Sequence, residues 1–152
     1  MHPDISRFPM KVFYDETIID ATEKTSAKIF IGDIFGNYSF IIVEYCIEHQ
    51  TGQSVQNVVE AAVAATIVSK LSKVIALKEN IGRIQTGELL SVEVKTVDSF
   101  QRDEKDIIIL STVRNNKFGN IGFLDSGGRD NVALIRARYI TFFPFRNCLW
   151  IL

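Results

Sequence analysis

The chain has 152 residues, of which 47% are hydrophobic and 23% are charged, and its formal net charge is −1. This composition excludes a disordered segment and fits one globular domain over 1–152 with a sizeable core. The near-neutral charge excludes a bulk basic field, so any contact with nucleic acid depends on the local placement of lysine and arginine.

The sequence carries no signal for a metal site or a membrane span. Cys46 and Cys148 lie far apart, and His2 and His49 belong to no ligand spacing such as HExxH, so we expect reduced thiols and no metal. The most apolar long stretch, 54–77, is interrupted by charged residues. We therefore expect an intracellular protein of the nucleus or cytoplasm, with no membrane partner.

The first half of the chain predicts a docking segment, two strands and a long helix. Residues 1–21 contain proline breakers and predict loop and a short helix. Residues 27–35 and 38–48 are rich in Ile, Phe, Val and Tyr and are punctuated by glycine, which predicts two strands joined by turns. Apolar residues at helical spacing predict a helix over 54–76, with Ser54 as its N-cap.

The second half predicts strands that alternate with a helix. Residues 91–97 alternate apolar and polar positions, and 106–113 is an apolar run suited to a fully buried strand. Asn131 is a candidate N-cap for a short helix over 131–138, and 148–152 is a further strand candidate. Together these elements predict a three-layer α/β domain with a mainly parallel sheet.

A polar run, QRDEKD, separates the two predicted strands of the second half. In open α/β sheets, functional groups gather in the loops beyond the carboxyl ends of strands. We therefore expect Asp98, Ser99, Gln101 and Glu104 to lie at that edge of the sheet.

Three segments carry a resemblance to a known family. KTVDSFQRDEKDIIILSTVRNN, then GNIGFLDSGGRDNVALIRARY, resemble the fifth and sixth motifs of superfamily 1 helicases of the up-frameshift and senataxin type. The opening MHPDISRFPMKVFYD resembles the segment that begins the second RecA-like domain of that family. The resemblance covers almost the whole chain and implies a RecA-like, P-loop NTPase-type α/β fold that lacks the P-loop domain itself.

The resemblance also implies roles in nucleotide contact. Arg136 matches the arginine that neutralises γ-phosphate charge, and this is the one catalytic role that it implies in this chain. Glu104 matches a glutamate that contacts the nucleotide ribose, and Gln101 matches a residue beside the phosphates. From the residues alone, Arg136 is equally a solvated arginine at a helix end, and Gln101 and Glu104 belong to an ordinary exposed turn.

Two hydroxyl residues match positions that the family uses against the nucleic-acid backbone. Thr96 and Ser99 are implied to contact phosphates without reading the sequence of the strand. Their alternative role is capping at the end of a strand.

The chain departs from the family pattern at several places. Arg102 stands where the fifth motif has glycine, Asp103 stands at an often basic position, and Ile135 replaces a threonine before the arginine. The strand and loop that follow the long helix in the family are missing, and YITFFPFRN within 139–147 predicts an awkward surface insertion. No P-loop or magnesium-binding second motif is present in the sequence.

The function implied is the C-terminal motor half of an ATP-dependent RNA or DNA helicase, so that this chain would be only a part of the working enzyme. Its partners would be single-stranded RNA or DNA and a first RecA-like domain, and it would meet ATP and Mg²⁺ only in the complete two-domain enzyme. We do not expect this chain to hydrolyse ATP alone. Two alternatives stay open: a non-catalytic remnant that binds nucleic acid or a protein, and a chain with a defective core.

Overall fold

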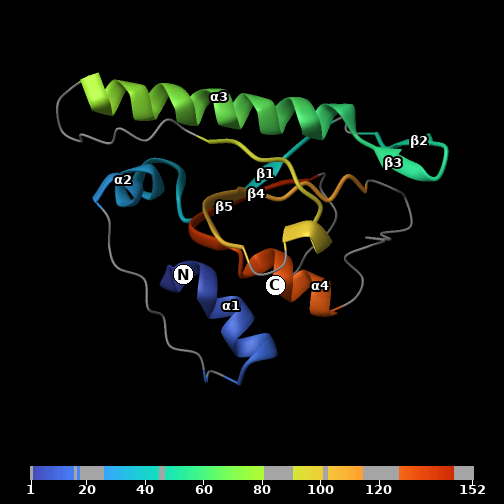
Figure 1. The fold of residues 1–152 in the computed structure, drawn as a ribbon, viewed down its shortest axis with the longest axis horizontal. Coiled ribbons are helices and arrows are strands. Elements are labelled where there is room, and N and C mark those ends of the chain that lie inside the picture. Colours follow the sequence, from blue (N-terminus) through green and yellow to red (C-terminus); the bar gives the residue numbers. More distant parts are fainter. Residues whose placement is uncertain are drawn as a thin grey trace.

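Three parallel strands form the centre of the molecule in a computed structural model (Figure 1). The structure describes residues 2–15, 17, 26–44, 47–80, 91–100, 103–114 and 127–145. The sheet order is β1 (Tyr38–Ile42), β5 (Ala137–Phe145) and β4 (Lys105–Ile109), and both pairings are parallel. The predicted α/β class with a mainly parallel sheet is confirmed, and the fold is RecA-like.

Helices cover both faces of this sheet. On one side lies α3 (Val58–Asn80), and on the other lie α1 (Pro3–Phe13) and α4 (Gly127–Leu134) (Figure 1). Helix α3 buries Ile67 and Leu71 in a cluster with Tyr139, Ile140 and Phe142 of β5. No helix in the described ranges combines the length and apolarity needed to cross a bilayer.

The phenylalanine-rich segment is the central strand, so its prediction as a surface insertion was wrong. Phe142 is only 2% exposed, Pro144 is fully buried, and β5 pairs with a strand on each side. A buried strand between two neighbours needs apolar side chains on both faces. The same composition would be awkward only if the segment lay on the surface, which is what we had expected.

Pro144 is tolerated in this central strand because of where it lies. Thr141 donates its backbone N–H toward β1, to the carbonyl of Asn37, whereas Phe142 presents its carbonyl to Leu110 after β4. Backbone groups alternate sides along a strand, so an N–H at position 144 would face the β4 side. The β4 ladder ends opposite Phe142, and the missing N–H therefore costs no hydrogen bond there.

The segment predicted as the first strand is instead helix α2 (Ser26–Phe35). Ile31 and Phe35, four residues apart, share a helix face, and the Phe35 ring meets the Phe142 ring edge-on at 6.0 Å between centroids. Gly36 follows with φ +78°, and its N–H donates to the carbonyl of Gly32 at 2.6 Å. A glycine in this left-handed conformation is a usual helix stop, and we had interpreted it as a turn between strands.

The predicted strand at 91–97 is not a strand in the structure. Val94 is 95% exposed, and only a 3₁₀ turn, η1 (Asp98–Phe100), follows. An alternating pattern becomes a strand only when a neighbouring strand accepts its hydrogen bonds, and none lies beside this segment among the described residues. A strand forms in the first part of the predicted run 106–113, as β4 (Lys105–Ile109). Its side chains are half-buried rather than fully buried.

Helix ends differ from their prediction in detail. Helix α3 is capped by Asn57, whose Oδ1 accepts from the N–H of Glu60 at 3.1 Å, whereas Ser54 lies in a small hairpin. That hairpin consists of β2 (His49–Thr51) and β3 (Ser54–Gln56). Asn131 lies inside α4 and donates to the hydroxyl of Tyr14 at 2.7 Å.

The N-terminal segment docks as expected, through α1. His2 caps this helix and donates its backbone N–H to the carbonyl of Arg138 at 2.7 Å. Ile5, on the inner face of this helix, is fully buried. The strand candidate at 148–152 and both cysteines lie outside the described residues.

Candidate functional site

The fifth- and sixth-motif segments meet at the amino ends of β4 and β5. The backbone N–H of Lys105 donates to the carbonyl of Arg136 at 3.1 Å, and Lys105 is in register with Ala137. The chain therefore enters two neighbouring parallel strands side by side. Since 91–97 is not a strand, Asp103 and Glu104 of the polar run lie at this amino edge, and our prediction of a carboxyl edge was wrong.

Arg136 lies half-buried in the turn between α4 and β5. Its Nε donates to the carbonyl of Val132 at 3.1 Å, and its Nη1 donates to the carbonyl of Asp103 at 3.4 Å. These bonds use two of the five N–H donors of a guanidinium. No carboxylate pairs with Arg136 in the described ranges, so its charge is held in place and not neutralised by an acid.

Glu104 lies beside Arg138, the first exposed residue of β5. Glu104 Oε2 and Arg138 Nε are 3.1 Å apart, and both side chains are about half exposed. The hydrogen bond that Arg138 donates to Glu104 raises the pKa of Arg138 above its already high value. This pair orients Glu104 at the same edge as Arg136, while a carboxylate keeps further acceptor positions open to a hydroxyl.

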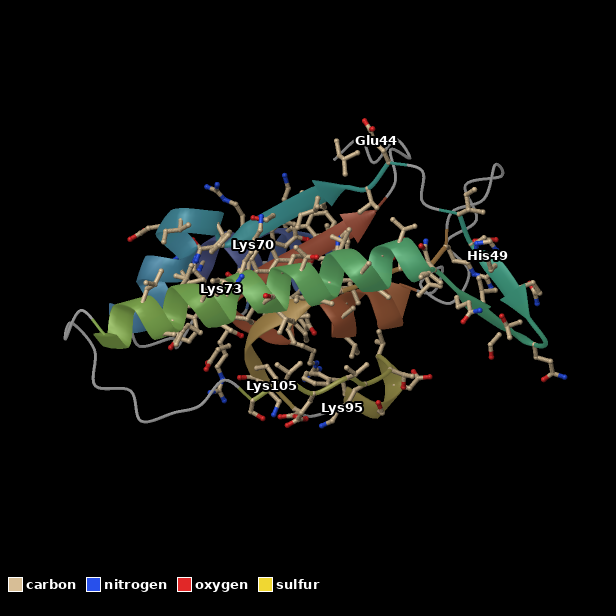
Figure 2. The ribbon with its side chains drawn as sticks, turned by 90° about the horizontal axis from the view of Figure 1, so that it is seen from above. Glu44, His49, Lys70, Lys73, Lys95 and Lys105 are labelled. Atoms are coloured by element: carbon tan, nitrogen blue, oxygen red, sulfur yellow. The ribbon has the colours of Figure 1, made fainter. Side chains whose placement is uncertain are left out.

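Four partly exposed charged side chains form a network in front of this edge. Lys95 Nζ lies 2.6 Å from Glu93 and 3.4 Å from Asp103, and Lys105 Nζ lies 3.0 Å and 3.5 Å from the same carboxylates. Figure 2 shows the two lysines side by side. The negative charge of Asp103, at a position that is often basic in the family, is therefore balanced by two lysines.

The network shifts the titration of its members. Hydrogen bonds from Lys95 and then Lys105 lower the pKa of Glu93, and the bond with Glu93 raises the pKa of both lysines. For Asp103, burial pushes the pKa upward, but the backbone N–H of Glu104 and the two lysines together bring that pKa below its usual value.

Thr96 and Ser99 adopt the capping arrangement. Thr96 Oγ1 donates to Ser99 Oγ at 3.0 Å, Ser99 Oγ donates to the Thr96 carbonyl at 2.8 Å, and the Ser99 N–H donates to Thr96 Oγ1 at 3.3 Å. Both hydroxyl protons are thus used inside the turn from Thr96 into η1. Their contact with nucleic acid stays a prediction, and Gln101 lies outside the described residues.

Sequence reasoning missed a buried carboxylate at the start of α3. Glu60 is fully buried and accepts from the Asn57 amide at 3.2 Å, from the Ser111 hydroxyl and from the Val113 N–H at 3.0 Å. Val113 has φ +62°, so this network holds a strained turn just beyond β4. The Asn-x-x-Glu spacing of a capping box was the available signal, because it marks a helix start.

The structure groups no three His, Cys, Asp or Glu side chains as metal ligands within its described ranges.

Comparisons with known proteins give matches over most of the chain. A family described as an AAA domain matches residues 1–86 and 73–143. The chain is similar to "Regulator of nonsense transcripts 1 homolog" of Arabidopsis thaliana, at 34% identity over 91% of this chain and 13% of that protein. It is also similar to "Helicase sen1" (33%) and "ATP-dependent helicase upf1" (30%) of Schizosaccharomyces pombe, again over 91% of this chain. It spans 10% and 18% of the length of those two proteins.

Proposed function

The chain belongs to the AAA domain family and resembles superfamily 1 helicase domains of the up-frameshift and senataxin type, and from this premise we propose that it is the C-terminal motor half of an ATP-dependent RNA or DNA helicase. In this role it contributes nucleotide-contacting side chains and one surface for single-stranded nucleic acid. A first RecA-like domain supplies the phosphate loop and the magnesium carboxylates.

One observation carries the proposal: Glu104 and Arg136, from two separate motifs, lie at one edge of the sheet. The bond between Lys105 N–H and the Arg136 carbonyl fixes the two segments at 3.1 Å. Arg136 has no carboxylate partner in the described part of the chain, so it suits a polyphosphate anion. Glu104 offers a carboxylate to a ribose hydroxyl, which is the division of roles that the resemblance implies.

The chemistry expected of these side chains is electrostatic. When ATP and Mg²⁺ are bound in the complete enzyme, they supply the reacting phosphoryl group and its counter-charge. Arg136 stabilises the negative charge that develops on the transferring phosphate, and its two bonds to backbone carbonyls hold the guanidinium in place beforehand. Glu104 positions the nucleotide, and Arg138 in turn positions Glu104.

A binding experiment tests the role of Glu104. A fluorescent ATP analogue is titrated into an equimolar mixture of this chain and the first RecA-like domain of a relative. Glu104→Ala should weaken binding about tenfold, the size of a charged hydrogen bond, and Arg138→Ala should weaken it less. The matched control is Glu44→Ala, an exposed glutamate beyond β1. Equal affinities of wild type and Glu104→Ala would contradict the assignment.

A further inference from the structure

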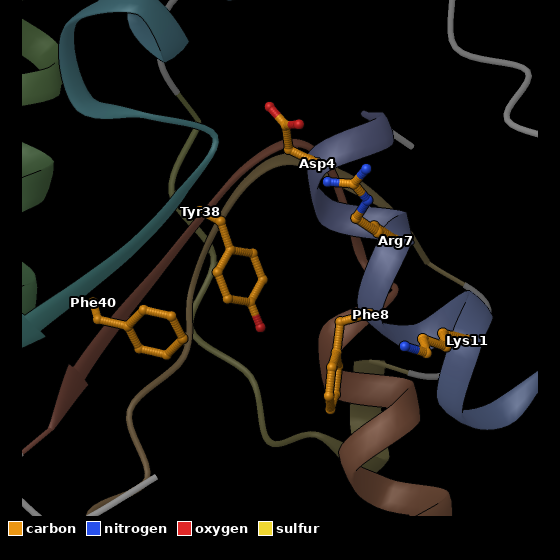
Figure 3. Close-up of a pocket in the computed structure, with 6 residues that line it drawn as sticks. All are labelled: Asp4, Arg7, Phe8, Lys11, Tyr38 and Phe40. Carbon is orange, nitrogen blue, oxygen red and sulfur yellow. The ribbon is translucent and has the colours of Figure 1, made fainter. Parts of the chain in front are cut away.

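A groove beside α1 has a composition that the nucleotide edge does not explain. It lies between α1 and β1, has a volume of about 310 Å³, and is drawn in Figure 3. We name it the α1–β1 groove and define it by six residues: Asp4, Arg7, Phe8 and Lys11 of α1, and Tyr38 and Phe40 of β1. Strand β1 borders β5 on the side opposite β4, away from Glu104 and Arg136.

Aromatic rings form the floor of the α1–β1 groove. Tyr38 and Phe40 lie two residues apart on one face of β1, with ring centroids 5.2 Å apart. The Phe40 ring stacks on Phe143 of β5 at 5.3 Å and 23°. Phe40 nevertheless remains 47% exposed and Phe8, across the groove, 37%. Phe40 and Phe8 therefore keep part of their ring surface accessible in the groove, while Tyr38 and Phe143 pack against Phe40.

Two cations stand at the rim. Arg7 and Lys11 are four residues apart on α1, so their side chains are neighbours on one helix face. Like charges at this spacing destabilise a helix, and neither side chain pairs with a carboxylate among the residues that the structure describes. The nearby Asp4 carboxylate lies 3.5 Å from His2 Nδ1 instead. This arrangement leaves a net positive rim beside exposed rings.

Proteins that bind single-stranded nucleic acid commonly place cations next to aromatic rings. The cations contact the phosphates, and the bases stack on the rings. An apolar peptide would need the rings but not two like charges. We propose that the α1–β1 groove binds one base of a single strand against Phe40 and Tyr38, with the neighbouring phosphates on Arg7 and Lys11. This rests on the proposed function, in which a single strand is the partner.

The test measures anisotropy of a labelled oligouridylate bound to the full chain at several salt concentrations. Phe40→Leu keeps the apolar volume and removes the ring, and it should weaken binding about 5- to 100-fold. Arg7→Gln removes one phosphate contact, so the slope of log affinity against log salt should fall by about 0.7. Because Arg7 is exposed, Arg7→Gln should leave the fold intact, so its binding can be measured even if Phe40→Leu is less stable.

The matched control is Lys73→Gln, an exposed lysine of α3 on the opposite side of the sheet (Figures 1 and 2). The inference fails if Lys73→Gln and Arg7→Gln change the slope equally, or if Phe40→Leu binds like wild type. It also fails if uridine monophosphate competes as well as the polymer, which would make the ligand a free nucleotide.

If wild type drives nucleic-acid-stimulated ATP turnover with a first domain while the groove variants bind normally, only this inference fails. If wild type binds no oligonucleotide, the proposed function fails with it.

Discussion

Glu60 is the residue whose burial has the clearest consequence for stability. Its carboxylate satisfies the Ser111 hydroxyl and the Val113 N–H at the turn beyond β4. Glu60→Ala leaves these groups without their partner, each at a cost of about 1–3 kcal/mol. We expect the free energy of unfolding in urea to fall by about 3 kcal/mol, and by less for Glu60→Gln. Glu44→Ala, an exposed control, should change it by no more than about 0.5 kcal/mol. Equal effects of Glu60→Ala and Glu44→Ala would contradict the network.

A second single residue, Tyr38, makes the free energy of unfolding depend on pH. Burial raises the pKa of its hydroxyl from 10.0 to about 12, so the folded state favours the neutral phenol. This contribution to stability is complete below pH 10 and is lost as the pH rises toward 12. Unfolding free energies of wild type should therefore fall more steeply in this window than those of Tyr38→Phe. The difference between the two proteins removes the contribution of the lysines, and parallel curves would contradict the burial of Tyr38.

At the scale of elements, local sequence patterns predicted those helices and strands whose formation depends mainly on nearby residues. The helical spacing around Ile67 and Leu71 predicted α3, and the β-branched run predicted β4. Helix α2 was missed because IFIGDIF suits a helix and a strand equally, and only packing of Ile31 and Phe35 on β5 selects the helix. The strand at 91–97 was predicted wrongly because its alternation says nothing about a neighbouring strand.

Helix α3 allows a matched test of its buried face. Leu71 is 3% exposed and packs in the core cluster, whereas Leu77 on the same helix is 60% exposed. Leu71→Ala removes buried apolar contacts and should lower the free energy of unfolding by about 2–5 kcal/mol. Leu77→Ala makes the same chemical change on the exposed side and should cost less than about 1 kcal/mol. Thermal or urea unfolding compares the two, and a larger loss for Leu77→Ala would show that α3 presents the other face.

At the scale of the whole molecule, the motif pattern predicted candidate site residues but not how they are arranged. The motif pattern singled out Glu104 and Arg136, which lie at the amino edge of the sheet. The predicted strand at 91–97 had placed Glu104 at a carboxyl edge instead. It also assigned Thr96 and Ser99 to nucleic acid, whereas both hydroxyl protons are used in a local turn. The α1–β1 groove escaped notice because it joins two segments whose proximity depends on the sheet order.

The central claim is that this domain carries the arginine of a two-domain motor. The most direct measurement is ATP turnover by this chain mixed with the first RecA-like domain of a relative, in the presence of single-stranded nucleic acid. The account predicts turnover above that of either domain alone, and a loss of about 10³-fold in the added rate for Arg136→Ala. Arg114→Ala, an exposed control, should retain that rate. No gain on mixing the two folded domains, or equal rates for Arg136→Ala and wild type, would contradict the account.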